Sequence, residues 1–113
     1  MDLSKTFLKL AGIDEPSYDG VDLLPILNEK SKNIERTLFW RSNCKARKQK
    51  AFRMGKWKYI LDVNCEMLFD LEKDIAEKEN LFYQFPEVIN KMKSSLALWQ
   101  AEMDKYKPKF KVK

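Results

Sequence analysis

Residues 86–106 read PEVINKMKSSLALWQAEMDKY, and this stretch carries the clearest structural signal in the chain. Its apolar residues recur every three or four positions, which places them on one face of a helix of about five turns. They are Ile89, Met92, Leu96, Trp99, Met103 and Tyr106. Glu87 near the start and Lys105 near the end both favour the helix dipole. A helix with such a continuous apolar face needs another layer of structure to cover.

The residues before this helix can supply that layer as a β-sheet. Residues 37–41, TLFWR, have the composition of a strand, and residues 50–54 and 56–61 flank Gly55 in a pattern typical of a hairpin. Alternation in the last of these runs places Trp57, Tyr59 and Leu61 on one face. Asn64 indicates a further turn before the strand-like residues 67–71. Three or four antiparallel strands joined by short turns are therefore expected.

The N-terminal residues predict short helical segments. Leu3, Phe7 and Leu10 follow a helical period, and Gly12 is a suitable helix stop. A turn-rich connector leads to residues 23–27, where Pro25 fits the start of a single helical turn. The fold class predicted is α+β: a small antiparallel sheet of three or four strands, covered on one face by a long C-terminal helix, with a short helical N-terminal segment.

At 113 residues, with 44% hydrophobic side chains, the chain is expected to form one domain. Its expected parts are an N-terminal helix and loop (1–35), the sheet (36–71), an acidic turn with the C-terminal helix (72–106) and a basic tail (107–113). The net charge of +5 is uneven, because residues 41–61 hold eight basic residues and no acid. This is a local surplus, and we expect no nucleic-acid binding from it. No apolar run approaches the roughly 20 residues of a membrane span, so no membrane insertion is expected.

The chain has no histidine, which excludes Ser-His-Asp and Cys-His nucleophiles and the usual zinc sites. Its two cysteines, Cys44 and Cys65, have no metal-ligand spacing. Whether they pair is left open by the sequence, because a disulfide depends on geometry.

Four segments, taken in order, resemble the C-terminal end of the sulfatase family, within the alkaline-phosphatase-like superfamily. They are DLSKTFLKLAGI (2–13), PSYDGVDLLPIL (16–27), RMGKWKYI (53–60) and EMLFDLEKDIAEKENL (66–81), followed by Pro86-Glu87. Each motif alone is weak, but the ordered set covers nearly all of residues 2–100. The chain departs from the family pattern at Lys5, where proline is usual, at Val21, where arginine is common, and at Asn28, where glycine is frequent.

The resemblance implies that the chemistry lies outside this chain. Sulfatases use a formylglycine made in a C/S-x-P-x-R motif, together with calcium or another divalent cation. Cys44 is followed by Lys45, Ala46, Arg47 and Lys48, so it does not fit that motif, and Cys65 does not fit either. No catalytic residue, metal ligand or cofactor site is therefore expected here. The expected partner is a missing N-terminal catalytic domain, and the expected parent enzyme is periplasmic or secreted.

The basic segment after the first strand is the one part suited to a sulfated substrate. Arg41, Lys45, Arg47 and Lys48 are the candidate binding residues, through charge-assisted hydrogen bonds to sulfate oxygens. The alternative is a solvated loop without a ligand, which is the commoner reason for charge in a loop. Arg53 and Lys58, inside the hairpin, are expected to be structural.

Three functions fit these observations. The first is the accessory subdomain of a sulfatase, which supports the fold and helps to shape the substrate pocket without turnover of its own. The second is a free-standing basic module that binds nucleic acid or an acidic polysaccharide. The third is a decayed relative that keeps only a structural role. Under the first, we expect exposed apolar side chains at Leu3, Phe7, Leu23 and Leu24, with self-association through this N-terminal segment.

Overall fold

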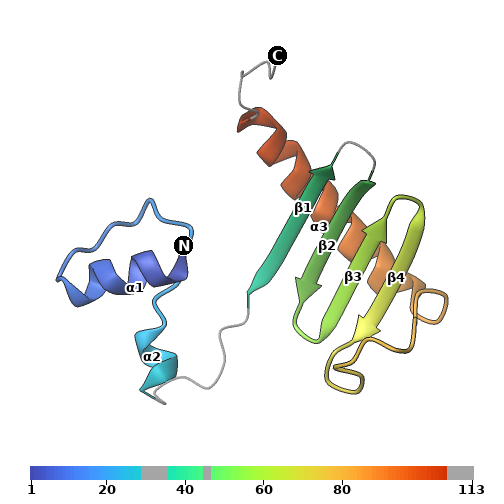
Figure 1. Ribbon diagram of the computed structural model, residues 1–113, viewed down its shortest axis with the longest axis horizontal. Coiled ribbons are helices and arrows are strands. Elements are labelled where there is room, and N and C mark those ends of the chain that lie inside the picture. The colour runs from blue at the N-terminus through green and yellow to red at the C-terminus, as the bar shows by residue number, and fades with distance from the viewer. Residues whose placement is uncertain (29–35, 45–46, 107–113) are drawn as a thin grey trace. The chain divides into compact units, whose positions relative to one another are not determined.

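The computed structural model describes residues 1–28, 36–44 and 47–106. The chain divides into two compact units, residues 1–35 and residues 36–113 (Figure 1). Each unit has its own set of internal contacts. Whether the two act as a single domain stays a prediction.

The N-terminal unit contains the two expected helical segments. Helix α1 spans Asp2–Leu10, and Gly12 follows it with φ +75°, a conformation that glycine adopts without a steric penalty. The single turn α2 spans Leu24–Leu27, with Pro25 in its first turn. The predicted helical N-terminal segment is confirmed.

Side-chain hydrogen bonds to the backbone hold α1 and the following connector together. The Thr6 hydroxyl donates to the carbonyl of Asp2 at 2.8 Å and accepts from the backbone N–H of Leu23 at 3.0 Å. The Asp2 carboxylate accepts from the N–H of Val21 at 3.2 Å. Gly20 is buried against the backbone of Met1, where an added Cβ would lie 2.4 Å from a carbonyl oxygen. The Asp, Thr and Gly of the first two motifs therefore have structural roles.

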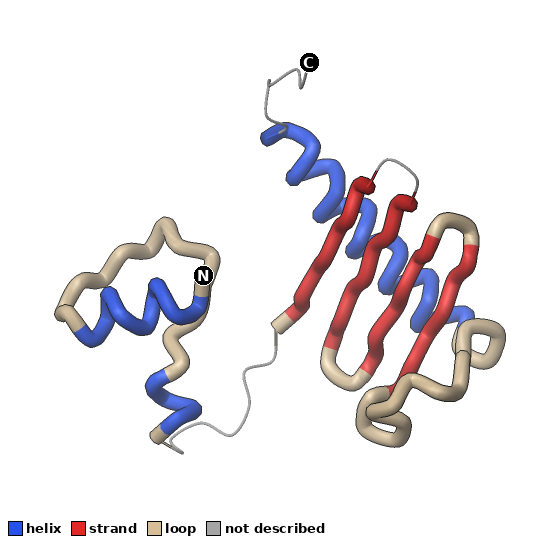
Figure 2. Tube along the Cα trace, in the orientation of Figure 1, coloured by secondary structure: helices blue, strands red, loops and turns tan. Residues whose placement is uncertain are grey.

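The second unit is built on one antiparallel sheet of four strands, in the order β1-β2-β3-β4 (Figure 2). The strands are β1 (Thr37–Cys44), β2 (Arg47–Met54), β3 (Trp57–Asp62) and β4 (Cys65–Asp70). Gly55, with φ +56°, lies in the two-residue turn between β2 and β3. Val63 and Asn64 form the turn between β3 and β4. The α+β prediction and the turn at Asn64 are confirmed.

The basic segment at 42–48 differs from its prediction as a loop. Ser42–Cys44 continue β1, and Arg47 and Lys48 begin β2, with Cys44 opposite Arg47 in the register. Residues 45 and 46 lie outside the described residues. The end of this hairpin has exposed residues on both faces, so its side chains show no apolar alternation. The backbone pairing, which does not depend on apolar side chains, makes it a strand.

Helix α3 (Pro86–Met103) lies across one face of the sheet (Figures 1 and 2). One row of that face crosses all four strands and consists of Phe39, Phe52, Tyr59 and Leu68, which are successive partners in the register. Phe52, Tyr59 and Leu68 are buried together with Ile89, Met92 and Leu96 of α3. Burial of apolar surface between these two layers is the main source of stability for the unit.

The apolar stripe of the helix ends earlier than predicted. Trp99 stacks on Phe39 with ring centroids 4.9 Å apart, so it still packs on the sheet. Tyr106, however, is 76% exposed. It belongs to the 3₁₀ turn η1 (Asp104–Tyr106), where three residues per turn replace 3.6 and the stripe loses its phase.

The acidic segment between β4 and α3 covers the outer edge of β4. Asn80 accepts a hydrogen bond from the N–H of Leu68 at 3.0 Å, and the N–H of Leu81 donates to the carbonyl of Leu68 at 2.8 Å. The Asp74 carboxylate accepts from the N–H groups of Lys78 and Glu79 at 2.6 and 2.8 Å. Backbone groups at a sheet edge need such partners. Asn80 of the fourth motif therefore closes the sheet at this edge, and Asp74 stabilises the turn that leads to it.

The two cysteines do not pair with each other. Cys44 lies on β1 and Cys65 on β4, at opposite edges of the sheet, and both are free and exposed. Three strand spacings separate them, about 14 Å, whereas disulfide-bonded residues have Cα atoms within about 7 Å. Among the described helices, none is long and apolar enough to cross a membrane.

Candidate functional site

The residues predicted to bind substrate are divided between the two faces of the sheet. Arg41 is two residues from Phe39 on β1 and so lies on the face that α3 covers. Lys48 shares that face. Arg47 lies on the opposite face, because it is an odd number of residues from Phe52 on β2. Lys45 lies outside the described residues. The described candidates therefore do not form one surface, and their role in binding stays a prediction.

Both arginines are already paired with carboxylates. The Arg41 guanidinium donates to Asp104 at 2.8 Å and lies 5.8 Å from the centre of the Trp99 ring. The Arg47 guanidinium donates to both oxygens of Asp62, with 2.8 Å between Nε and Oδ1. This hydrogen bond lowers the pKa of Asp62 and raises the pKa of Arg47. A sulfate would have to compete with these carboxylates for the same donors.

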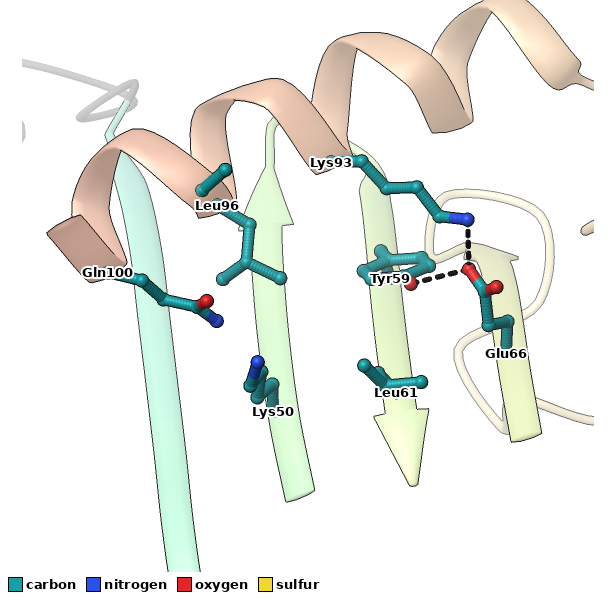
Figure 3. Close-up of a pocket in the computed structure, with 8 residues that line it drawn as sticks. Lys50, Tyr59, Leu61, Glu66, Lys93, Leu96 and Gln100 are labelled. Carbon is teal, nitrogen blue, oxygen red and sulfur yellow. Dashed lines mark hydrogen bonds and ion pairs between the residues drawn. The ribbon is translucent and has the colours of Figure 1, made fainter. Parts of the chain in front are cut away.

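A groove runs beside α3, over the part of the sheet where Lys50 lies next to Arg41, one of the predicted substrate-binding residues (Figure 3). Its cavity has a volume of about 210 Å³. One wall is one side of α3, with Lys93, Ala97 and Gln100 spaced four and three residues apart. The floor comes from the sheet and the underside of the helix. The floor residues are Lys50, Tyr59, Leu61, Glu66 and Leu96.

Glu66 holds one end of this groove in place. The Tyr59 hydroxyl donates to Glu66 Oε2 at 2.6 Å, and the Lys93 ammonium forms an ion pair with the same oxygen. The hydrogen bond from Lys93, followed by that from Tyr59, lowers the pKa of Glu66. Burial, followed by the contact with Glu66, raises the pKa of Tyr59, so its hydroxyl keeps its proton at neutral pH.

Lys50 differs from the other cations in this region. It is opposite both Arg41 on β1 and Leu61 on β3 in the register, and it is half-buried. Its ammonium forms no ion pair with the described residues. Figure 3 shows Lys50 and Gln100 at one end of the groove, with Glu66 and Lys93 at the other. No local sequence pattern reveals this groove, because its lining residues come from β2, β3, β4 and α3 and only the strand register brings them together.

The described residues contain no group of three or more His, Cys, Asp or Glu side chains that could hold a metal ion. The acidic residues of 72–79 are occupied with other contacts where the structure shows them: Glu77 bonds Lys58 at 2.6 Å, and Asp74 bonds backbone amides. The groove itself presents an ammonium, an amide and an apolar floor.

The family described as N-sulphoglucosamine sulphohydrolase, C-terminal, matches residues 1–102. The chain belongs to this sulfatase C-terminal family. The resemblance that the four motifs carry is confirmed. No match is found among curated proteins.

Solved sulfatase structures contain the same fold. A protein of Bacteroides thetaiotaomicron described as a sulfatase is 26% identical, with a TM-score of 0.73 over 89% of this chain. A 2-O GAG sulfatase is 26% identical, with a TM-score of 0.72 over 99% of the chain. Ps i-CgsB in complex with k-i-k-neocarrahexaose is 26% identical, with a TM-score of 0.72 over 87%. This chain covers 24%, 26% and 23% of these three chains, or about a quarter of their length.

Proposed function

We propose that this chain is the accessory part of a sulfate-ester hydrolase and that the rest of the enzyme supplies the nucleophile and the divalent cation. The observation that supports the proposal most strongly is the family match over residues 1–102 in a chain without histidine. A formylglycine would be the nucleophile in the catalytic part, and a cation such as calcium would neutralise the sulfate oxygens there.

The surface through which the subdomain meets the catalytic part is, in this proposal, the apolar face of α1. Leu3, Phe7 and Leu10 lie on one side of that helix and are 62%, 63% and 62% exposed. Leu23 and Leu24, which were expected to be exposed as well, are half-buried. A helix that leaves its apolar face uncovered needs a partner surface, and three quarters of the matched sulfatase chains lie beyond the aligned part.

The proposal is tested by activity on an aryl sulfate. The purified 113-residue chain should not hydrolyse it, with or without calcium. A protein that joins this chain to a preceding domain with a C/S-x-P-x-R motif should hydrolyse it. Turnover by the 113-residue chain that co-elutes with it through successive columns would contradict the proposal.

The docking surface is tested separately. In the joined protein, Phe7→Glu should loosen the contact between the two parts, so that a protease separates them faster. Lys9→Glu, on the same helix and also exposed, should not have this effect. In the isolated chain, concentration-dependent dimers that Phe7→Glu abolishes would show a second copy on the same face. Equal resistance of both variants to proteolysis would place the contact elsewhere.

A further inference from the structure

We infer that the groove beside α3 is a binding site for a sulfated saccharide, with the Lys50 ammonium on the sulfate and Gln100 on a sugar hydroxyl. The substrate class rests on the proposed function. The position of the site rests on the groove itself, which lies between β2, β3, β4 and α3 (Figure 3).

The charges of the groove favour an anion at the Lys50 end. Lys93 is neutralised by Glu66, and Arg41 by Asp104. Lys50 has no such partner among the described residues, although it is half-buried and lines the cavity. Lys48 lies two residues away on the same face, also without an ion pair among the residues described. A half-buried ammonium such as that of Lys50 is screened less by salt than an ammonium on an open surface.

The other lining residues favour a saccharide over a simple anion. Gln100 offers an amide donor and an amide acceptor, which suits a hydroxyl group. Glu66 uses Oε2 for Tyr59 and Lys93, so Oε1 can accept from another hydroxyl. Leu61 and Ala97 present apolar surface to the carbon-bound hydrogens of a sugar ring. Sulfate alone would use only the Lys50 end of this arrangement.

The same groove is poorly suited to single-stranded nucleic acid. Bases bind largely by stacking on exposed aromatic rings. The aromatic residue that lines the groove is Tyr59, which is 1% exposed and packed in the core. The site therefore lacks a stacking surface within the part of the chain that is described.

The test is calorimetric titration of the 113-residue chain at low salt with a sulfated carrageenan hexasaccharide. The expected result is binding that weakens about tenfold in Lys50→Gln, the effect of losing one charge-assisted hydrogen bond. Lys91→Gln is the matched control, because Lys91 is exposed on the other side of α3 and lines no part of the groove. Its affinity should equal that of the unchanged chain. Circular dichroism should show that both variants remain folded.

Further titrations distinguish the contact to the sulfate group from the contact to the sugar. The desulfated hexasaccharide should bind at least tenfold more weakly, and Gln100→Leu should weaken the hexasaccharide without changing binding of inorganic sulfate. Equal affinity in Lys50→Gln and Lys91→Gln would overturn the assignment, as would an RNA hexamer that binds as tightly as the saccharide. No measurable binding of the sulfated hexasaccharide would overturn it too.

These outcomes can be told apart from failure of the proposed function. If the joined enzyme hydrolyses an aryl sulfate while Lys50→Gln leaves saccharide affinity unchanged, the groove assignment alone is wrong. If Lys50→Gln weakens saccharide binding but the joined protein has no sulfatase activity, the groove stands as a saccharide site and the proposed function is wrong.

Discussion

The N-terminal unit and the sheet unit are held together by different interactions. In residues 36–113, six buried apolar residues from the strands and α3 form one cluster. In the described part of residues 1–35, the buried residues are Thr6 and Gly20, and the side chains that connect the segments are polar. The apolar side chains of α1, Leu3, Phe7 and Leu10, remain exposed beside these contacts.

This difference shows which unit carries its own stability. Apolar burial is proportional to the area removed from water, and a cluster of six side chains supplies it within the sheet unit. The few hydrogen bonds of the N-terminal unit contribute about 1 kcal/mol each, little against the entropy of ordering some 28 residues. We expect the sheet unit to fold cooperatively and the N-terminal unit to open at much lower free energy.

The largest expected effect is a core truncation in the sheet unit. Leu96→Ala should lower the free energy of unfolding by about 2–5 kcal/mol, because Leu96 is 5% exposed and its loss leaves a cavity under α3. Urea denaturation followed by circular dichroism measures the change. The control is Leu98→Ala, the same substitution on the same helix at a residue 75% exposed, which should change stability by less than about 0.5 kcal/mol. Similar losses of unfolding free energy in both variants would show that the buried cluster is not the main source of stability of the sheet unit.

A second variant tests the N-terminal unit alone. Thr6→Val keeps the shape of a residue that is 4% exposed but removes its hydrogen bonds to Asp2 and Leu23. Local stability should fall by about 1–2 kcal/mol, since the N–H of Leu23 loses its partner. Hydrogen exchange should accelerate at Leu23 and remain unchanged in β2 and β3. Ser4→Ala, at an exposed position of α1, should leave both unchanged. Faster exchange in the sheet would mean that the two units unfold together.

The sequence predicted most of the elements because local patterns determine them. The helical period of residues 86–99, the glycine in the turn after β2 and the alternation of Trp57, Tyr59 and Leu61 all have a local physical cause. The extension of β1 and β2 through residues 42–48 could not be predicted in this way, because strand pairing there depends on the partner backbone and not on apolar side chains.

The candidate site was harder to predict for the same reason. Arg41 and Arg47 look like free cations in the sequence, yet each meets a carboxylate from a distant position, Asp104 and Asp62. Lys50, which lacks such a partner among the described residues, reads as one more lysine in a basic run. The difference depends on the register and on where α3 crosses the sheet, neither of which composition determines.

A third prediction concerns pH and the contact between α3 and β4. The hydrogen bond from Lys93 holds the pKa of Glu66 below its ordinary value of 4.5. A carboxyl group whose pKa is lower in the folded state adds stability above its ordinary pKa and loses that contribution as pH falls through and below it. The midpoints of urea denaturation should therefore differ between Glu66→Gln and the unchanged chain at pH 7. They should converge below about pH 4.5. At neutral pH the difference should be below about 1 kcal/mol, because the ion pair is partly exposed.

The control for this pH effect is Glu79→Gln, since Glu79 is exposed and forms no ion pair with the described residues. Its stability should follow that of the unchanged chain at every pH. A constant offset between Glu66→Gln and the unchanged chain down to pH 3 would show that the carboxylate charge does not stabilise the contact.

The one gain in stability that we expect is at the turn between β3 and β4. Val63 adopts φ +56°, where a β-branched side chain is strained, and its N–H donates to the carbonyl of Lys48 at 3.0 Å. Val63→Asn keeps this hydrogen bond and tolerates the left-handed backbone, so the free energy of unfolding should rise by about 0.5–1 kcal/mol. Val63→Ile keeps both the branching and the strain and should give no gain. Because Val63 is 54% exposed, neither variant alters the core. Urea denaturation measures the change, and a midpoint for Val63→Asn no higher than that for Val63→Ile would show that the backbone at this turn is not strained.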